Sequence, residues 1–367
     1  MGEDLGAWAA GKLVDQAWAA YREGRFQQVL AAAGRAVEAA GQLDDPALLV
    51  RALSVQATAL RLTGDYVAAL ARYTKIMALA EDPAISGRLD DPDAAEAVAD
   101  AYWGWVEAAE FVTGIPVREL FTALDVADRR LTATGHRDWR AGILMQRAWV
   151  HRRLGETEAA VAAAEEALAV RLQYPDAPGS TLNNVRCALG DILQSAGRVA
   201  EAAPYYQAIL DDPDAIPWDR RRAHQGLAWC AVAAGDPGTA RREARTAVLL
   251  AEPHGDVALC TSHAVLAEAC RDDGDLEAAW QAATRYLEAA GRIGGHYWPY
   301  GAAESAVDIA LERADLAAAR RLIGEMEDHA SALDADTSVT YYTSATTQRR
   351  QRLNDLTEAH SPHTNAD

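Results

Sequence analysis

The chain has 367 residues, half of them hydrophobic, and carries 54 acidic against 35 basic side chains, a formal net charge of -19. A surface this negative repels a phosphate backbone, which argues against general nucleic-acid binding. No apolar run reaches the roughly 20 residues of a membrane-spanning helix. The first residues are acidic, where a secretory signal is basic, so we expect a cytoplasmic protein that does not enter membranes.

The first predicted element is a pair of helices. Val14, Ala17 and Tyr21 recur at helical spacing before a turn at Gly24, and a second helix is predicted over residues 26–40. Because a helix with one apolar stripe must bury it, the two helices are expected to pack against each other.

The next pair has the clearest pattern of the chain. Within Leu53–Tyr73, the small residue Ala57 lies seven positions before Gly64, and a second small residue, Ala69, lies five positions after it. Glycine supplies the positive φ that ends the first helix, and the small side chains let two backbones approach closely. The segment is therefore predicted to be a helical hairpin.

Acidic triplets with a proline follow some of these segments, at residues 44–46, 90–92 and 211–213. Aspartate caps free helix amides and proline suits the first helical position, so each triplet predicts the start of a helix. A calcium loop would need oxygen ligands at alternating positions and a glycine-directed turn. Capping is the favoured interpretation.

The third unit departs from the pattern. Glu107 stands seven positions before Gly114, where a small side chain is expected, and Gly114 follows Gly64 by 50 residues. We expect a lengthened loop near residues 83–92 and some distortion of the stack there.

Later units are regular. The same spacing of small residues recurs around Gly155, Gly197, Gly235 and Gly274, and an alanine, Ala314, takes the place of the last turn glycine. Breaks between units are expected at residues 175–179, 213–217, 253–255 and 291–299. The last of these introduces a run of aromatic residues that is either a binding loop or a packed turn between units, namely His296, Tyr297, Trp298 and Tyr300.

The repeat pattern fades after Leu333. We expect a superhelical domain over residues 1–335, a C-terminal capping helix within 336–358, centred on 348–356, and a disordered tail over 359–367.

Successive turn residues are 38 to 50 positions apart. This recurrence resembles the tetratricopeptide repeat (TPR) family, whose usual period is about 34 residues. The longer period, with Thr181-Leu182-Asn183-Asn184, is similar to the extended repeats of kinesin light chains and to the TPR regions of actinobacterial regulators. The resemblance implies an all-α, right-handed α-solenoid of about eight helical hairpins.

The resemblance also implies that the first helix of each unit lines a concave groove. Arginines then concentrate in the first two-thirds of this wall and carboxylates in its last third. Arginine beside tryptophan suits an extended peptide, although packing between repeats is an equal alternative for each tryptophan. The lysine and asparagine clamp of chaperone-binding arrays is not recognisable. The candidate peptide-binding residues are Arg51, Arg61, Trp149, Arg152, Asn184, Asp191, Arg222, Gln225, Trp229 and Glu268.

Neither a metal, a cofactor nor a catalytic residue is predicted. Cys260, His263 and Cys270 share one predicted helix, but structural zinc ligands usually sit on knuckles or turns. The four cysteines show no disulfide framework and are expected to be reduced thiols. Nucleophile-elbow, phosphate-loop and dinucleotide motifs are absent from the sequence. Acidic groove residues would support general acid–base chemistry only if desolvated.

The expected function is therefore a protein- or peptide-binding scaffold or adaptor that uses its concave groove. One alternative is a regulatory sensor, in which a peptide or metabolite tightens the superhelix. A second alternative is a small-molecule enzyme built in the groove. An open channel favours the scaffold, whereas a deep closed pocket with paired carboxylates favours the enzyme.

Overall fold

The computed structural model describes residues 2–89, 91–109, 111–112, 115–134, 140–174, 181–335 and 341–360. Within these ranges the regular secondary structure is helical, with no strand. None of the helices in these ranges combines the length and the apolar character needed to cross a lipid bilayer.

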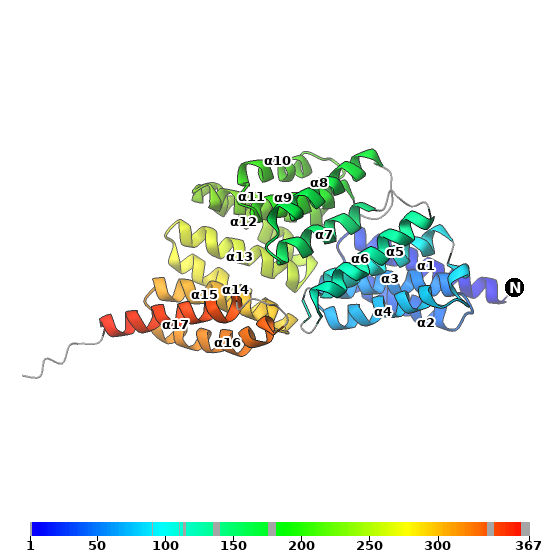
Figure 1. The fold of residues 1–367 in the computed structure, drawn as a ribbon. Helices are drawn as coiled ribbons and strands as arrows, with labels where there is room; N and C mark the ends of the chain where they lie inside the picture. Colours follow the sequence, from blue (N-terminus) through cyan, green and yellow to red (C-terminus); the bar gives the residue numbers. More distant parts are fainter. Residues whose placement is uncertain are drawn as a thin grey trace, which may run out of the picture.

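Sixteen of the α-helices form eight successive hairpins, and a seventeenth packs on the last one (Figure 1). This confirms the all-α solenoid expected from the sequence. The hairpins are α1 (Gly2–Arg22) with α2 (Phe26–Gly41), α3 (Pro46–Thr63) with α4 (Tyr66–Glu81), α5 (Pro92–Ala109) with α6 (Val117–Thr134), α7 (Arg140–Arg153) with α8 (Thr157–Gln173), α9 (Leu182–Ser195) with α10 (Val199–Leu210), α11 (Pro217–Ala233) with α12 (Pro237–Ala251), α13 (Asp256–Asp272) with α14 (Leu276–Ile293), and α15 (Tyr297–Glu312) with α16 (Leu316–Asp334).

Three of the hairpin turns contain a glycine–aspartate pair, at residues 64–65, 235–236 and 274–275. Gly64 ends α3 with φ 92°, and the carboxylate of Asp65 then accepts a hydrogen bond from the Ala68 amide at 3.1 Å to cap α4. Glycine takes the left-handed conformation at no steric cost, and aspartate satisfies an amide that the helix leaves free. This confirms the hairpin turn predicted at Gly64.

Capping explains two of the three acidic triplets. Asp45 accepts from the Leu48 amide at 3.0 Å and Asp91 from the Ala94 amide at 3.2 Å. The third prediction is wrong, because Asp212 accepts from the Asp214 amide within a loop, and α11 begins only at Pro217. A local turn uses this aspartate before the helix starts.

The irregular third unit is preceded by the expected long loop, which contains a short 3-10 helix at Ser86–Arg88 and buries Leu89. The predicted turn at Gly114 and the break at residues 175–179 lie outside the described residues. The aromatic segment predicted as a loop or turn near residue 296 is largely helical, because α15 already begins at Tyr297.

Where neighbouring units pack, the ring of a tyrosine lies directly against a glycine of the adjacent helix. Tyr206 of α10 is fully buried, and a Cβ added to Gly190 or Gly226 would lie 2.7 or 2.3 Å from its ring. Tyr73 lies in the same way on Gly104, where an added Cβ would come within 2.5 Å. Because glycine has no side chain, the tyrosine ring can lie against the backbone, and this contact sets how closely successive hairpins stack.

The superhelix turns far enough for its beginning to meet its end. The Phe26 ring lies 5.6 Å from Trp218 and 5.8 Å from His254, and Tyr66 stacks on Phe111 at 4.4 Å. Phe111 also stacks on Trp298 at 5.7 Å, and the Trp298 indole N–H donates to the Tyr66 hydroxyl at 3.1 Å. We call these contacts the closing seam: Phe26, Tyr66 and Phe111 on one side, and Trp218, His254 and Trp298 on the other.

Helix α17 (Tyr341–His360) packs against α16 and α15, and its role as a cap stays a prediction. The Tyr300 hydroxyl donates to the Tyr342 carbonyl at 3.0 Å, and Leu353 is buried against the last hairpin. The helix is longer than the predicted core at residues 348–356 and reaches His360. The tail predicted to be disordered lies outside the described residues from 361 on, and the division of the chain at residue 335 stays a prediction.

Candidate functional site

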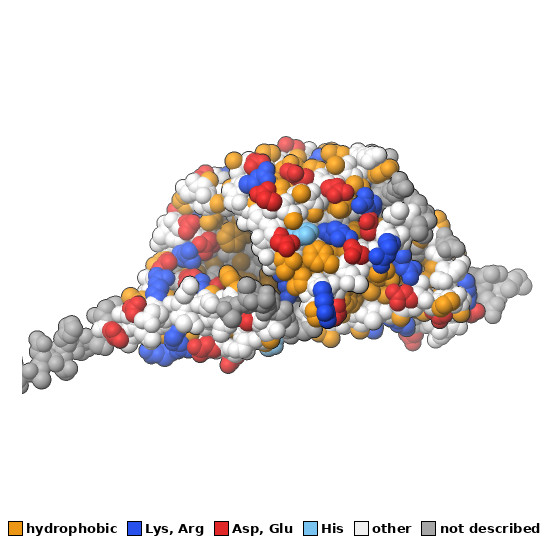
Figure 2. Space-filling model, viewed as in Figure 1, with side chains coloured by type: hydrophobic (Ala, Val, Ile, Leu, Met, Phe, Trp, Pro, Cys, Tyr) orange, Lys and Arg blue, Asp and Glu red, His pale blue; other side chains and the backbone are white. Residues whose placement is uncertain are grey.

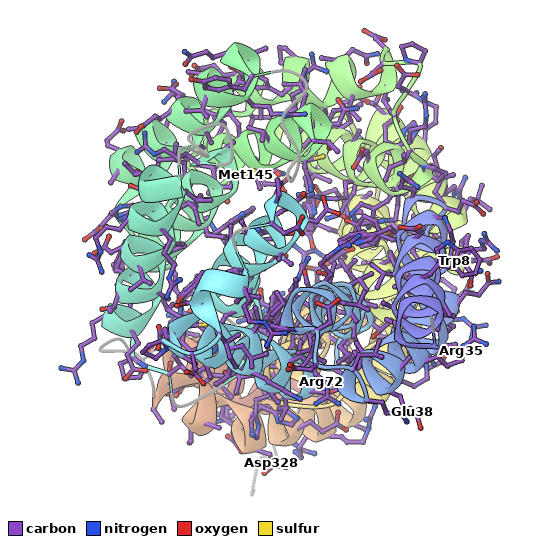
Figure 3. The ribbon with its side chains drawn as sticks, turned by 90° about the vertical axis from the view of Figure 1, so that its right-hand side faces the viewer. Trp8, Arg35, Glu38, Arg72, Met145 and Asp328 are labelled. Atoms are coloured by element: carbon purple, nitrogen blue, oxygen red, sulfur yellow. The ribbon has the colours of Figure 1, made fainter. Side chains whose placement is uncertain are left out.

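The closing seam and the inner helices line a cavity of about 1340 Å³ that is partly open to solvent. Residues of α1, α3, α5, α7, α9, α11, α13 and α15, the first helix of every hairpin, line it, and α17 adds Tyr341 and Tyr342. Figure 2 shows the surface hollowed over α13, between α7 and the C-terminal helices. In Figure 3 the helices run around the middle of the molecule, with Met145 on the inner side and Trp8, Arg35 and Glu38 on the outer rim.

The wall of the cavity is rich in aromatic side chains. They come from both halves of the chain and include members of the closing seam, so the cavity and the seam are continuous. Such rings offer large apolar area with little side-chain freedom to lose on binding. The aromatic lining residues are Trp18, Tyr21, Tyr66, Trp103, Phe111, Trp149, Trp218, Tyr286, Tyr297, Trp298, Tyr300, Tyr341 and Tyr342.

One polar cluster joins the second, third and fourth units. The buried guanidinium of Arg61 pairs with Glu107, and the Gln146 amide donates to the other oxygen of that carboxylate at 3.4 Å. Glu107 therefore stands where a small residue was expected because it balances the charge of a buried arginine from the preceding unit. Nearby, Trp103 donates its indole N–H to Asp100 at 2.8 Å, and burial raises the pKa of Asp100 to about 6.

A second polar cluster lies on α9 and α11. Arg222 donates to Asn184 at 2.8 Å and to Asp191 at 3.2 Å, and Asp191 also accepts from the Tyr206 hydroxyl at 2.6 Å. Its neighbour Arg221 is only 3% exposed and lies over the Trp218 ring at 4.4 Å.

Arg221 has only neutral hydrogen-bond acceptors in the described structure. It donates to Gln225 at 2.9 Å, to Thr261 at 3.0 Å and to Ser262 at 3.3 Å. Burial, and then the charge of Arg222, lower the pKa of Arg221 to about 9. Burying a cation without a carboxylate partner destabilises the protein. A ligand group rich in hydrogen-bond acceptors would stabilise this part of the wall.

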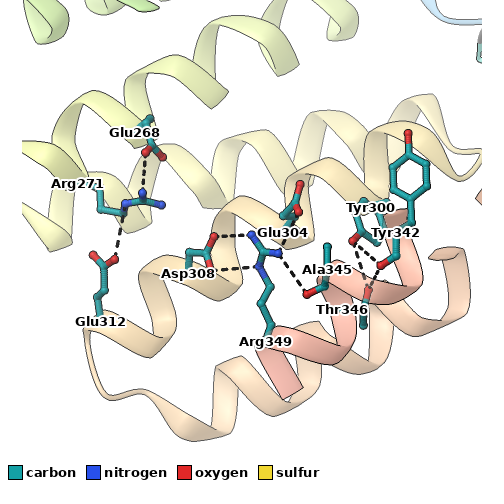
Figure 4. A network of polar contacts seen from close by, with 10 residues as sticks. All are labelled: Glu268, Arg271, Tyr300, Glu304, Asp308, Glu312, Tyr342, Ala345, Thr346 and Arg349. Atoms are coloured by element: carbon teal, nitrogen blue, oxygen red, sulfur yellow. Dashed lines mark hydrogen bonds and ion pairs between the residues drawn. The ribbon is translucent and has the colours of Figure 1, made fainter. Parts of the chain in front are cut away.

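The acidic last third of the wall is neutralised from within the chain (Figure 4). Arg349 of α17 donates to Asp308 at 2.7 Å and forms an ion pair with Glu304 at 3.1 Å. Arg271 likewise pairs with Glu268 at 2.6 Å. The carboxylates that the sequence places on the inner wall therefore hold the capping helix and neighbouring arginines.

The four cysteines and the potential metal ligands of the described residues give little support for thiol or metal chemistry. All four cysteines are buried and free, and burial raises the pKa of Cys187 and of Cys260 to about 12, which disfavours the reactive thiolate. Among the residues that the structure describes, no group of three or more potential metal ligands comes together.

The comparison with known families decides the identity of the repeat. A tetratricopeptide repeat model matches residues 141–174, the hairpin of α7 and α8 around Gly155. Residues 141–174 are therefore identified as a tetratricopeptide repeat. No curated protein sequence matches the chain, and its similarity to kinesin light chains or actinobacterial regulators stays a prediction.

Solved structures support the TPR fold over nearly the whole chain. The Cut9–Hcn1 hetero-tetramer of the APC/C is 15% identical with a TM-score of 0.58 over 92% of this chain and 55% of the other. The apo form of RapI is 10% identical with a TM-score of 0.50 over 95% and 99% of the two chains. The chain thus spans about half the length of the first of these structures.

The TPR geometry brings eight of the ten predicted site residues to the cavity and leaves two outside its lining. Trp229 packs between α11 and α13, and Glu268 lies with Arg271. Only the N-terminal parts of α11 and α13 line the cavity, up to Gln225 and Thr261. A helix rises about 1.5 Å per residue, so Trp229 and Glu268 lie further along their helices than the last lining residue. These two predicted residues are therefore not part of the cavity lining, and their inward placement stays a prediction. The eight lining residues are Arg51, Arg61, Trp149, Arg152, Asn184, Asp191, Arg222 and Gln225.

Several lining residues were not predicted. Arg221 adjoins the predicted Arg222 and carries no distinguishing signal in the repeat pattern. Tyr66 is the first residue of α4, and Phe111 lies in the turn after α5. The repeat pattern assigns both positions to the outside of the solenoid. Only closure of the superhelix turns these rings inward.

Proposed function

We propose that this repeat protein is a scaffold that binds a peptide segment of a protein partner inside the cavity. The enclosed volume, about 1340 Å³, is larger than the roughly 300–1,000 Å³ of ordinary small-molecule sites. A peptide segment fills such a space, and aromatic or arginine side chains from seven of the eight hairpins are available to hold it. This lining is the observation that carries the proposal.

Trp149 and Arg152 form the contact we place at the centre of binding. The Arg152 guanidinium lies over the Trp149 ring at 4.7 Å, and its side chain remains exposed. An arginine stacked on an indole offers donors to a ligand carboxylate or carbonyl while the ring covers apolar groups. Aromatic and arginine residues at the centre of an interface commonly carry most of its binding energy.

The wider context supports protein binding as the general role. One similar structure is itself a hetero-tetramer, Cut9–Hcn1. We propose a cytoplasmic location, where the four free cysteines stay reduced, and no general nucleic-acid binding, given the net charge of -19.

The closing seam favours a regulatory sensor as the second candidate. Because seam rings such as Tyr66, Phe111 and Trp298 also line the cavity, a bound ligand touches both sides of the closure. A ligand that binds the closed form better would shift the molecule toward that form.

Catalysis has less support than binding. The acidic groove residues Asp191, Glu268 and Asp308 each pair with an arginine. A general acid–base pair needs carboxylates whose protonation the site can change.

Two tryptophans at equivalent positions of their hairpins provide the test. Peptides are selected from a phage-displayed library on the wild-type protein, and their affinities are measured by calorimetry for Trp149→Ala and Trp229→Ala. Trp149 lines the cavity and Trp229 does not. We expect Trp149→Ala to weaken binding by about tenfold or more and Trp229→Ala to leave it within about twofold.

Both substitutions remove a half-buried indole, so circular dichroism and thermal unfolding check that each variant folds. Equal affinities of the folded Trp149→Ala variant and the wild type, or a library that yields no binder, would contradict binding in the cavity.

A further inference from the structure

Arg221 is a buried arginine of the cavity wall whose charge has no counter-ion. Three other arginines of the same lining, Arg51, Arg61 and Arg222, each pair with a carboxylate. Arg152 has no carboxylate partner among the described residues, but its side chain is exposed to solvent. Arg221 is only 3% exposed, and no carboxylate of the described residues forms an ion pair with it. The missing counter-charge destabilises the protein.

Two hydrogen-bond donors beside this charge are unused. Arg221 Nη1 donates to Gln225 Oε1 at 2.9 Å, to Thr261 at 3.0 Å and to Ser262 at 3.3 Å. In the described structure Arg221 Nη2 has no partner, and unlike Nε it is not a buried atom. The NH₂ group of Gln225 likewise makes no hydrogen bond there and is not buried, since the side chain is half-buried. Both donors are therefore accessible to a ligand.

The hydrogen bond between the two side chains keeps these donors close together. Nη1 and Nη2 belong to one planar guanidinium, and Oε1 and Nε2 belong to one planar amide. The bond of 2.9 Å joins these two rigid groups. Residues 221 and 225 are four positions apart on α11 and lie on the same face of the helix. Both side chains line the cavity, so the two donors serve the same space.

Trp218 holds the guanidinium in place. Its ring lies 4.4 Å from the Arg221 guanidinium carbon, and the ring also lines the cavity. A stacked arginine keeps its in-plane N–H groups for hydrogen bonds. A carboxylate or a phosphate accepts from several donors and supplies the missing negative charge, whereas an amide supplies no charge and an ammonium group is repelled.

We propose that Arg221 and Gln225 bind an oxyanion of the bound segment, which accepts hydrogen bonds from Arg221 Nη2 and Gln225 Nε2. Two sources offer this chemistry: the carboxylate of an acidic side chain or chain end, and a phosphoryl group on a side chain. The inference rests on the proposed function, because it names a group that the peptide presents. A segment that also contacts Trp149 on α7 passes over α9, which packs against both α7 and α11.

The test titrates the full chain with propionate and with methyl phosphate. The melting temperature at each concentration gives the dissociation constant, because a ligand of the folded state stabilises it by mass action. Propionamide is the matched neutral probe, since it has the size of propionate without the charge. Ionic strength is held constant, so that general screening does not contribute. We expect a saturable rise of the melting temperature with at least one anion and none with propionamide.

Arg221→Met removes the cation and keeps a long side chain. We expect it to weaken anion binding by about tenfold or more. Arg242→Met, on the exposed side of α12 and outside the cavity lining, controls for the lost charge and should bind as the wild type does. Gln225→Met removes the neutral donor and should weaken binding by about threefold, with the exposed Gln207→Met as its control. Tighter binding of propionate assigns the carboxylate source, and tighter binding of methyl phosphate assigns the phosphoryl source.

The proposal is overturned if neither anion raises the melting temperature, if propionamide raises it equally, or if folded Arg221→Met binds the anions as tightly as the wild type. Circular dichroism checks folding, and should Arg221→Met not fold, an unchanged affinity of Gln225→Met overturns the proposal instead.

These outcomes differ from failure of the proposed function. Selected peptides that lose affinity for Trp149→Ala but not for Arg221→Met would refute oxyanion recognition and retain peptide binding. Anion binding that requires Arg221, together with selected peptides that ignore Trp149→Ala, would do the reverse.

Discussion

Single residues show where the repeat is under strain. The described glycine turns within the hairpins have φ between 69° and 92°, whereas Ala314 adopts φ 58° at the equivalent turn. The left-handed conformation costs an alanine about 1–2 kcal/mol because its Cβ crowds the backbone. The sequence predicted the turn at Ala314 from its neighbours, and the structure shows that the fold imposes it despite the side chain.

Ala314→Gly should relieve this strain and raise the free energy of unfolding of the last hairpin by about 0.5–1 kcal/mol, after the greater freedom of glycine in the unfolded chain is subtracted. Hydrogen exchange of the α15 and α16 amides measures it. Ala234→Gly is the control, because Ala234 has φ -85° and glycine there should lower stability by about 0.5–1 kcal/mol. Equal effects at the two sites would show that Ala314 is unstrained.

At the scale of the element, helices pack through tyrosines set against residues without side chains. The sequence pattern identified Gly190 as a small residue before a turn, but it did not identify Tyr206 as the ring that fills the space. Gly226, on the following hairpin, faces the same ring. The tyrosine thus fixes the spacing of three helices, α9, α10 and α11.

Gly226→Ala should lower the free energy of unfolding by about 2 kcal/mol, because the new methyl group overpacks a ring that has no room to move. Urea denaturation followed by circular dichroism measures the change. Gly291→Ala is the matched control, since an added Cβ in α14 meets no atom within 4 Å and should raise stability by about 0.5–1 kcal/mol. A Gly226→Ala protein as stable as the wild type would refute tight packing on Tyr206.

For the whole molecule, the closing seam brings the beginning of the solenoid against its later hairpins, so that the inner helices surround a partly open cavity. The sequence predicted a groove, and the structure shows that its ends meet through residues as far apart as Tyr66 and Trp298, which are separated by 232 positions. Stacked repeats otherwise contact only their neighbours. The seam therefore determines whether the inner surface is a trough or a cavity.

Trp298→Ala should open the seam. Loss of the buried indole should lower the free energy of unfolding by about 3 kcal/mol and increase the radius of gyration measured by small-angle X-ray scattering. Trp8→Ala, which removes a tryptophan that is 64% exposed, should change stability by no more than about 0.5 kcal/mol and leave the radius unchanged. An unchanged radius in a folded Trp298→Ala protein would show that other contacts hold the molecule closed.

The sequence by itself determined the hairpins and their turns, because glycine, aspartate and small residues act over a few helical turns. Only the tertiary structure decided that Trp149 lines a cavity while Trp229 does not, that Glu107 balances Arg61, and that Tyr66 meets Trp298. The repeat pattern is nearly the same in every unit. Closure depends instead on the small rotation between each hairpin and the next, added over eight hairpins. No single position of the sequence specifies this total rotation.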